Sequence, residues 1–96
     1  MLCNIQNTMP KIGNIILPDF PLLLAPMEDV SDPPFRAVCK DNGADLMYSE
    51  FISSEGLIRD AIKSMKKLDF SEEERPFGIQ IFGGDEEAMA MSARIC

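Results

Sequence analysis

The chain has 96 residues, 46% of them hydrophobic and 26% charged, which is the composition of an ordinary globular protein and fits one small domain at most. Nine basic and sixteen acidic residues give a net charge of −7, which argues against a broad electropositive surface for nucleic acid within these residues. No apolar run approaches the roughly 20 residues of a membrane span, and no basic segment leads into a long apolar stretch as in a secretory signal.

The cysteines and the absence of histidine argue against several kinds of site. Cys3, Cys39 and Cys96 are odd in number and widely spaced, so zinc fingers and disulfide frameworks are poor interpretations and we expect no metal. Without histidine, Ser-His-Asp and Cys-His catalysis are excluded within these residues. A cytoplasmic protein with reduced thiols and no contact with a membrane is the expectation.

The first half of the chain is divided clearly by prolines and glycines. Residues 1–10 form an N-terminal extension, and residues 12–17 are expected to form a short hairpin that covers one end of the core. The apolar run 22–25 lies between prolines and is typical of a strand buried on both faces. Ser31-Asp32-Pro33-Pro34 predicts a helix start and Asn42-Gly43 a helix end. The expected apolar face of this helix consists of Phe35, Val38 and Cys39.

The second half repeats the order of strand and helix twice. Residues 46–48 predict a strand, and one helix is expected from residue 53 or 54 to residue 68. After a polar loop at 71–76, residues 77–82 predict the third strand. Asp85 is expected to cap a third helix. The expected buried faces of the two helices consist of Leu57, Ile58, Ala61, Ile62, Met65 and Leu68, and of Ala88, Met91 and Ile95.

Three alternating strand and helix pairs indicate an α/β fold with a parallel sheet. Three parallel strands leave both sheet edges unpaired, which is a poor finished domain. We therefore predict that residues 11–96 are the first three β/α units of a (β/α)8 TIM barrel, preceded by the hairpin, and that this barrel is incomplete within the chain.

Sites in such folds form at the carboxyl ends of the strands. Gln80 is a primary amide in an apolar strand, where it either bonds to a neighbouring strand or binds a ligand. An amide both donates and accepts, which suits the edge of a flavin or a pyrimidine. Pro26 and Met27 directly follow the first strand, and the Met27 thioether suits a flat ring as well as a core. Glu28, Asp29 and Glu50 lie near the same face, either as exposed charges or as pocket groups.

Three segments together resemble the tRNA-dihydrouridine synthase family. Residues 24–36, LAPMEDVSDPPFR, are similar to the family signature A-P-M, a short turn and D-x-P-F-R. Residues 43–50, GADLMYSE, resemble the family's second strand, and residues 75–83, RPFGIQIFG, its third. The similarity runs from about Lys11 to the last residue.

The resemblance implies a barrel that binds FMN, uses NADPH as reductant and reduces uridine in tRNA to 5,6-dihydrouridine. By position it implies FMN contacts from Pro26, Met27, Glu28 and Gln80, with Glu50 as a candidate pocket residue. Because the family often has alanine at the place of Glu28, a backbone role is expected there. The family's catalytic cysteine belongs to an N-x-G-C-P stretch that these 96 residues do not contain, so no catalytic residue is expected here.

The resemblance also implies that tRNA is bound mainly by parts outside this chain, and we expect the 96 residues alone to be inactive. Two alternatives stay open. One is another FMN-dependent barrel oxidoreductase that acts on a small molecule. The other is a non-catalytic remnant that only associates with other chains through its open sheet edges.

Overall fold

The computed structural model describes residues 9–96. Most of the predicted extension, residues 1–10, and Cys3 lie outside the described residues. The strands are β1 Lys11–Ile12, β2 Ile15–Ile16, β3 Met47–Tyr48, β4 Ile52–Ser53, β5 Phe77–Gly78 and β6 Ile81–Phe82. The helices are α1 Pro33–Asp41, α2 Ser54–Arg59, α3 Ala61–Met65 and α4 Glu86–Ile95, with 3-10 turns η1 Lys66–Leu68 and η2 Glu72–Glu74. Within residues 9–96, no helix is long and apolar enough to cross a membrane.

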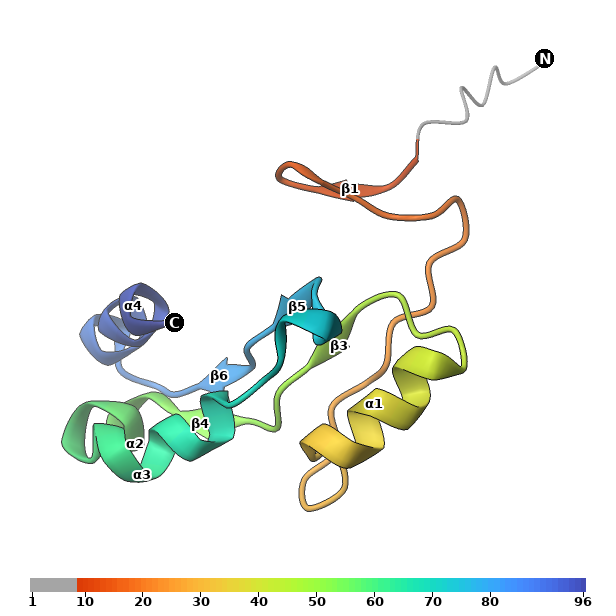
Figure 1. Cartoon of the computed structure of the whole chain (residues 1–96). Helices are drawn as coiled ribbons and strands as arrows, with labels where there is room; N and C mark the ends of the chain where they lie inside the picture. The colour runs from red at the N-terminus through yellow and green to blue at the C-terminus, as the bar shows by residue number, and fades with distance from the viewer. Residues whose placement is uncertain (1–8) are drawn as a thin grey trace, which may run out of the picture.

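The predicted hairpin is confirmed. Strands β1 and β2 pair antiparallel, with Lys11 opposite Ile16 and Ile12 opposite Ile15. The chain is then tied back to the hairpin's start, because the Leu17 N–H donates to the Pro10 carbonyl at 2.8 Å. Figure 1 shows the hairpin at one end of the molecule, on the far side of β3 and β5 from α2 and α4.

The strands that follow the hairpin pair in parallel, as the alternating order predicts. Strand β3 pairs with β5, and β4 pairs with β6 (Figure 1). The segment 22–25 joins through a parallel bridge from Leu23 to Leu46, and the Leu24 N–H donates to the Leu46 carbonyl at 2.9 Å. The described chain is thus a mixed α/β structure of parallel strand and helix units behind an antiparallel hairpin, and residues 9–96 do not close a barrel.

The prediction that residues 22–25 are buried on both faces is wrong. Leu22 is 52% exposed and Leu23 is 49% exposed. The bridge to Leu46 is the segment's one strand pairing within the described part of the chain, so its other edge has no neighbour there. The interior lies instead around β3, β4 and α2, where Met47, Ile52 and Leu57 are almost fully buried.

Helix α1 begins and ends as predicted, but its buried face differs. The Asp32 carboxylate accepts the Phe35 N–H at 3.0 Å, which is the expected N-cap, and Asn42 forms the C-cap. Val38, expected on the apolar face, is 62% exposed, whereas Arg36 is 2% exposed. The reason is that α1 contacts η2, and the side that meets η2 carries the arginine.

The continuous helix predicted for residues 54–68 is broken at Asp60, whose φ of −139° and ψ of 76° are not helical. Asp60 ends α2 and caps α3, because its carboxylate accepts the Lys63 N–H at 3.2 Å. The break turns the later residues away from the interior. Leu57 is fully buried, but Ile62 is 82% exposed. Side chains at Ile58 and Met65 are also exposed, so the predicted single buried stripe is wrong.

Helix α4 has the predicted cap and a different buried face. The Asp85 carboxylate accepts the Ala88 N–H at 2.8 Å. Ala88 and Ser92 are buried, whereas Met91 and Ile95 are each nearly half exposed, contrary to the prediction. Small residues face α2, because this lets the two helices approach until the Ser92 hydroxyl donates to the Ser54 carbonyl at 3.2 Å.

Candidate functional site

A register shift interrupts both central strands at the same level. Tyr48 lies opposite Gly78, and the next pairing is Ile52 opposite Ile81. Residues 49–51 therefore face only residues 79–80, which is a one-residue bulge. Bulges re-aim side chains and are common next to active sites. The predicted strand ends thus need correction: the second strand does not stop near Ser49 but resumes as β4, and residues 77–82 form two short strands, not one.

Beside the bulge lies an open cavity of about 450 Å³, which we call the strand hollow; it is lined by Pro26, Tyr48, Ile79, Gln80 and Ile81. The hollow brings Pro26, from the end of the first strand segment, next to Gln80 from the third. The expectation that Gln80 is buried is wrong, because the residue is exposed. The bulge explains this exposure: Gln80 lies between β5 and β6 and is a member of neither strand.

Gly78 shapes one wall of the strand hollow. A Cβ atom at this position would lie 2.5 Å from Cδ1 of the Tyr48 ring, which is closer than real Cβ atoms come to a neighbour. The glycine therefore lets the aromatic ring lie directly against β5. Any larger residue would push the ring of Tyr48 and change the hollow that it lines.

The loop after Pro26 is a tight turn closed by Ser31. The Ser31 hydroxyl accepts the Met27 N–H at 2.8 Å, and the Met27 carbonyl accepts the Ser31 N–H at 2.9 Å. Asp29 takes a φ of +60°, which a non-glycine residue adopts rarely. Met27 is 41% exposed and lies outside the lining of the strand hollow. The turn therefore presents the thioether to solvent while holding the Met27 amide.

Glu28, Asp29 and Glu50 form an acidic cluster. One carboxylate oxygen from each lies within 4.8 Å of the others. Lys67 partly offsets this charge, because its Nζ lies 3.3 Å from Oε1 of Glu28. The same ammonium lies 5.4 Å from the centroid of the Phe51 ring. That the chain binds no metal stays a prediction.

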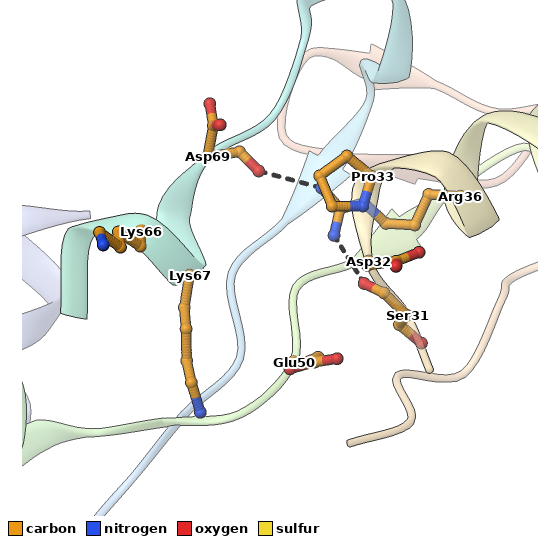
Figure 2. Close-up of a pocket in the computed structure, with 8 residues that line it drawn as sticks. All are labelled: Ser31, Asp32, Pro33, Arg36, Glu50, Lys66, Lys67 and Asp69. Atoms are coloured by element: carbon orange, nitrogen blue, oxygen red, sulfur yellow. Dashed lines mark hydrogen bonds between the residues drawn. The ribbon is translucent and has the colours of Figure 1, made fainter. Parts of the chain in front are cut away.

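A second, smaller cavity of about 160 Å³ opens beside the acidic cluster; we call it the arginine cavity, and it is lined by Ser31, Asp32, Pro33, Arg36, Glu50, Lys66, Lys67 and Asp69. Figure 2 shows Lys66 and Lys67 on one side, Arg36 and Ser31 on the other, and Glu50 between them. Glu50 therefore lines a cavity, but not the one that Gln80 lines.

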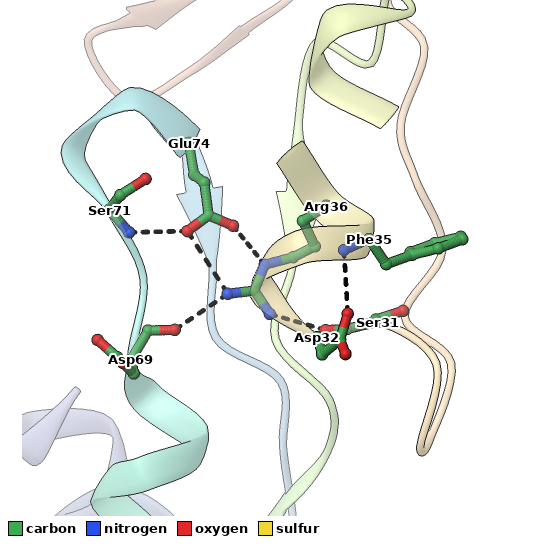
Figure 3. Close-up of polar contacts among 7 residues, drawn as sticks. All are labelled: Ser31, Asp32, Phe35, Arg36, Asp69, Ser71 and Glu74. Carbon is green, nitrogen blue, oxygen red and sulfur yellow. Dashed lines mark hydrogen bonds and ion pairs between the residues drawn. The ribbon is translucent and has the colours of Figure 1, made fainter. Parts of the chain in front are cut away.

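Arg36 is bound on every side of its guanidinium (Figure 3). Its Nε donates to Glu74 in an ion pair whose side chains are 3% and 5% exposed. Its two other nitrogens donate to the Ser31 carbonyl at 2.7 Å and the Asp69 carbonyl at 3.0 Å. Glu74 in turn accepts the Ser71 N–H at 2.7 Å. One side chain thus joins the turn after the first strand to the segment before the third.

The charge of Glu74 is stabilised within this network. Burial alone would raise the pKa of the Glu74 carboxyl, but the hydrogen bonds from Arg36 and the Ser71 N–H, with the positive charge of Arg36, lower the pKa overall. The ion pair is therefore present in its charged form at neutral pH. By contrast, burial raises the pKa of the Cys96 thiol, which makes it a poor nucleophile.

Aromatic rings extend the Arg36 network toward the sheet. The Arg36 guanidinium lies 4.8 Å from the centroid of the Phe77 ring. Phe77 stacks on Phe70 at 4.9 Å, and the Arg75 guanidinium lies 4.9 Å from the Phe70 centroid. Two cations thus enclose two stacked rings, which is a favourable electrostatic arrangement. The column holds the start of β5 against α1.

Interpretation of the sequence alone misses Arg36 and Glu74. The predicted polar loop 71–76 in fact contains η2, in which Glu74 is 4% exposed. A signal was available: Ser71 followed three residues later by Glu74 is the capping-box pattern, and both of its hydrogen bonds are present. What the pattern does not reveal is the distant arginine that also binds this carboxylate.

The donor set of the strand hollow suits the edge of a flat heterocycle. Within residues 9–96 the Gln80 side-chain amide makes no hydrogen bond to another residue, so one carbonyl and two N–H groups face the opening. Pro26, Tyr48 and the isoleucines supply apolar surface around this amide. Apolar walls with a few placed polar groups are the common composition of a cofactor site. The residues present therefore fit part of a flavin site.

Comparison with known proteins agrees with the resemblance found in the sequence. The profile of the family described as "Dihydrouridine synthase (Dus)" matches residues 23–96. A "Probable tRNA-dihydrouridine synthase" of Aquifex aeolicus is 43% identical over 72 residues, which are 75% of this chain and 22% of that protein. The "tRNA-dihydrouridine synthase B" of Pseudomonas syringae pv. tomato is 40% identical over 73 residues, which are 76% of this chain and 22% of that protein.

A third relative extends the match slightly. The "tRNA-dihydrouridine synthase B" of Pseudomonas aeruginosa is 38% identical over 84 residues, which cover 88% of this chain and 25% of that protein. The chain thus spans about a quarter or less of the length of these relatives. Since the family profile covers most of the 96 residues, and includes Pro26, Met27, Glu28, Glu50 and Gln80, the chain belongs to the dihydrouridine synthase family.

Proposed function

We propose that residues 11–96 are the first three β/α units of an FMN-binding (β/α)8 barrel. In the whole protein this barrel would reduce uridine in tRNA to 5,6-dihydrouridine with NADPH as reductant. The family membership and the names of the relatives support the reaction and the tRNA substrate. The parallel order of the segment 22–25, β3 and β5 supports the barrel architecture.

The observation that carries the proposal is the meeting of Pro26 and Gln80 in the strand hollow. These residues are 54 positions apart in the sequence, and the family resemblance implies an FMN contact for each of them. Gln80 would hydrogen bond to the polar edge of the flavin, because its amide both donates and accepts. Pro26 would supply apolar contact next to it.

Met27 and Glu28 would contribute differently from each other. The Met27 N–H is already bound to Ser31, so we assign its role to the exposed thioether, which packs well on flat rings. The Glu28 carboxylate is paired with Lys67, which supports a backbone contact to FMN rather than a carboxylate contact. Glu50 lines the arginine cavity and would act at the margin of the site.

Bound FMN would supply the hydride chemistry, while the chain's own residues would bind and orient the ring. The target uracil has to leave the stacked RNA to reach a barrel interior. The 96 residues lack the N-x-G-C-P stretch, so we assign no proton-donating residue to them. With a net charge of −7, they would also supply little of the tRNA-binding surface.

A flavin titration tests the proposal. We expect the chain to quench FMN fluorescence in a saturable way. The variant Gln80→Met keeps the side-chain length but removes the amide, and should weaken binding by about tenfold, since one lost hydrogen bond is worth about that factor. Asn42→Ala is the matched control, because it removes an amide that caps α1 and lies outside the lining of the strand hollow.

Two results would contradict the proposal. One is a wild-type chain that does not bind FMN, and the other is a Gln80→Met variant that binds FMN as tightly as Asn42→Ala. A separate assay with uridine-containing tRNA, NADPH and FMN should show no turnover by the chain alone. Turnover in that assay would disprove the assignment of the proton donor to residues outside this chain.

A further inference from the structure

Ser49 lies at the centre of the bulge and is fully buried. Its N–H donates to the Gly78 carbonyl at 2.9 Å, which continues the β3 and β5 ladder by one bond. Beyond this point the backbone of the two strands no longer matches in register. The next N–H of the neighbouring strand to need a partner in this region belongs to Gln80.

The Ser49 side chain supplies that partner. Its hydroxyl accepts the Gln80 N–H at 3.0 Å and donates its own proton to the Glu50 carbonyl at 2.9 Å. The Gln80 carbonyl is bound as well, because it accepts the Ile52 N–H at 2.9 Å. Both backbone groups of Gln80 are therefore held, although the residue lies outside the regular ladder.

We propose that Ser49 is a positioning residue, whose hydroxyl bridges the bulge and thereby holds the Gln80 amide toward the strand hollow; its effect on ligand binding rests on the proposed FMN function. A hydroxyl suits this task because it can accept from one strand and donate within the other at once. Alanine offers neither bond, and the Gln80 N–H would lose its partner in a half-buried place.

The position of the serine also separates two groups of the site. Gln80 lines the strand hollow, whereas Glu50 lines the arginine cavity. Ser49 contacts the backbone of both residues. Loss of the hydroxyl should therefore free the bulge to rearrange and alter both cavities, while the flanking pairs Tyr48 with Gly78 and Ile52 with Ile81 keep the strands together.

The test uses the chain with Ser49→Ala, Ser49→Thr and the matched control Ser92→Ala. Ser92 is also fully buried and also donates to a carbonyl, that of Ser54, but it lies between α2 and α4. Backbone amide hydrogen exchange at Gln80 is measured by NMR, and FMN affinity by fluorescence quenching. Ser49→Ala should speed exchange at Gln80 by about tenfold and weaken FMN binding by a similar factor.

Ser49→Thr keeps the hydroxyl and should restore slow exchange, and Ser92→Ala should change neither the Gln80 amide nor FMN affinity selectively. Should Ser49→Ala fail to fold, Ser49→Cys carries the test, because sulfur keeps the volume but is a weak acceptor. Unchanged exchange at Gln80 in the alanine or cysteine variant, relative to Ser92→Ala, would overturn the inference.

The two proposals fail in different ways. If the wild-type chain does not bind FMN, the proposed function falls, and the exchange of the Gln80 amide still decides the role of Ser49. If FMN binds and Gln80→Met weakens it, but Ser49→Ala changes neither exchange nor affinity, the cofactor site stands and the positioning role is wrong.

Discussion

The two cavities of this chain differ in how their polar groups are bound. In the arginine cavity, Arg36 and Glu74 are almost fully buried and bind each other and three backbone groups. In the strand hollow, Gln80 is exposed and only its backbone is held. The difference separates a stabilising site from a candidate binding site, because a side chain that is already bound on all sides has no capacity for a ligand.

Removal of Arg36 should have the largest effect. Arg36→Met leaves the Glu74 carboxylate buried without its partner, which should cost about 3–5 kcal/mol of unfolding free energy. Urea denaturation measures this loss. Arg75→Met is the control, because Arg75 forms an exposed pair with Glu72, whose loss should cost at most about 1 kcal/mol. Equal losses in the two variants would refute the contrast between the cavities.

A methyl group at Gly78 should have the next largest effect and acts on the strand hollow. Gly78→Ala places a Cβ against the Tyr48 ring and should destabilise the chain by about 1–3 kcal/mol, because the ring has to shift. It should also weaken FMN binding. Gly84→Ala is the control, since no atom lies within 4 Å of its added Cβ. Thermal unfolding of both variants checks this, and similar melting temperatures would contradict it.

Acid should weaken the Arg36 network. The pKa of Glu74 is lowered on folding, so the unfolded chain binds the proton more tightly and the stabilising contribution is complete above the ordinary pKa of 4.5. It is lost as the pH falls below 4.5 through the pKa of the folded state. Between neutral pH and about pH 3, wild type should therefore lose more unfolding free energy than Glu74→Gln. Parallel pH profiles of the two proteins would contradict the lowered pKa.

The exposed pair should show the smallest effect. Glu72→Gln breaks the 2.7 Å contact with Arg75, whose side chains are 81% and 58% exposed. Solvent screens such a pair, so the change should be at most about 1 kcal/mol and should shrink further at high salt. Urea denaturation at two salt concentrations measures it. A loss comparable to that of Arg36→Met would show that exposure does not distinguish the two ion pairs.

The local elements were largely predictable from the sequence. Asp32 and Asp85 cap the helices at the predicted places, and the hairpin forms within the predicted residues. Each of these features depends on side chains that bond to the backbone three residues away or on a short turn. The break at Asp60 has the same local chemistry, an aspartate that caps the following helix, but the apolar periodicity across it favoured one continuous helix.

Exposure and register were not predictable in the same way. Met91 and Ile95 fit an apolar stripe, yet α4 approaches α2 through Ala88 and Ser92. The bulge at Ser49 cannot be recognised in either strand alone, because it is a mismatch between residues 49–51 and 79–80. The side-chain chemistry of Gln80 makes it a candidate in the sequence alone, but its exposure depends on that mismatch.

The amino-acid sequence by itself determined the caps, the turns, the alternating order of strands and helices, and the motifs that identify the family. These depend on bonds between residues close together in the chain. Only the tertiary structure decided that Arg36 meets Glu74, that Ser49 bridges to Gln80, and that Pro26 and Gln80 line one hollow. Each of these contacts joins residues far apart in the chain, so its partner is chosen by strand register and packing and not by local preference.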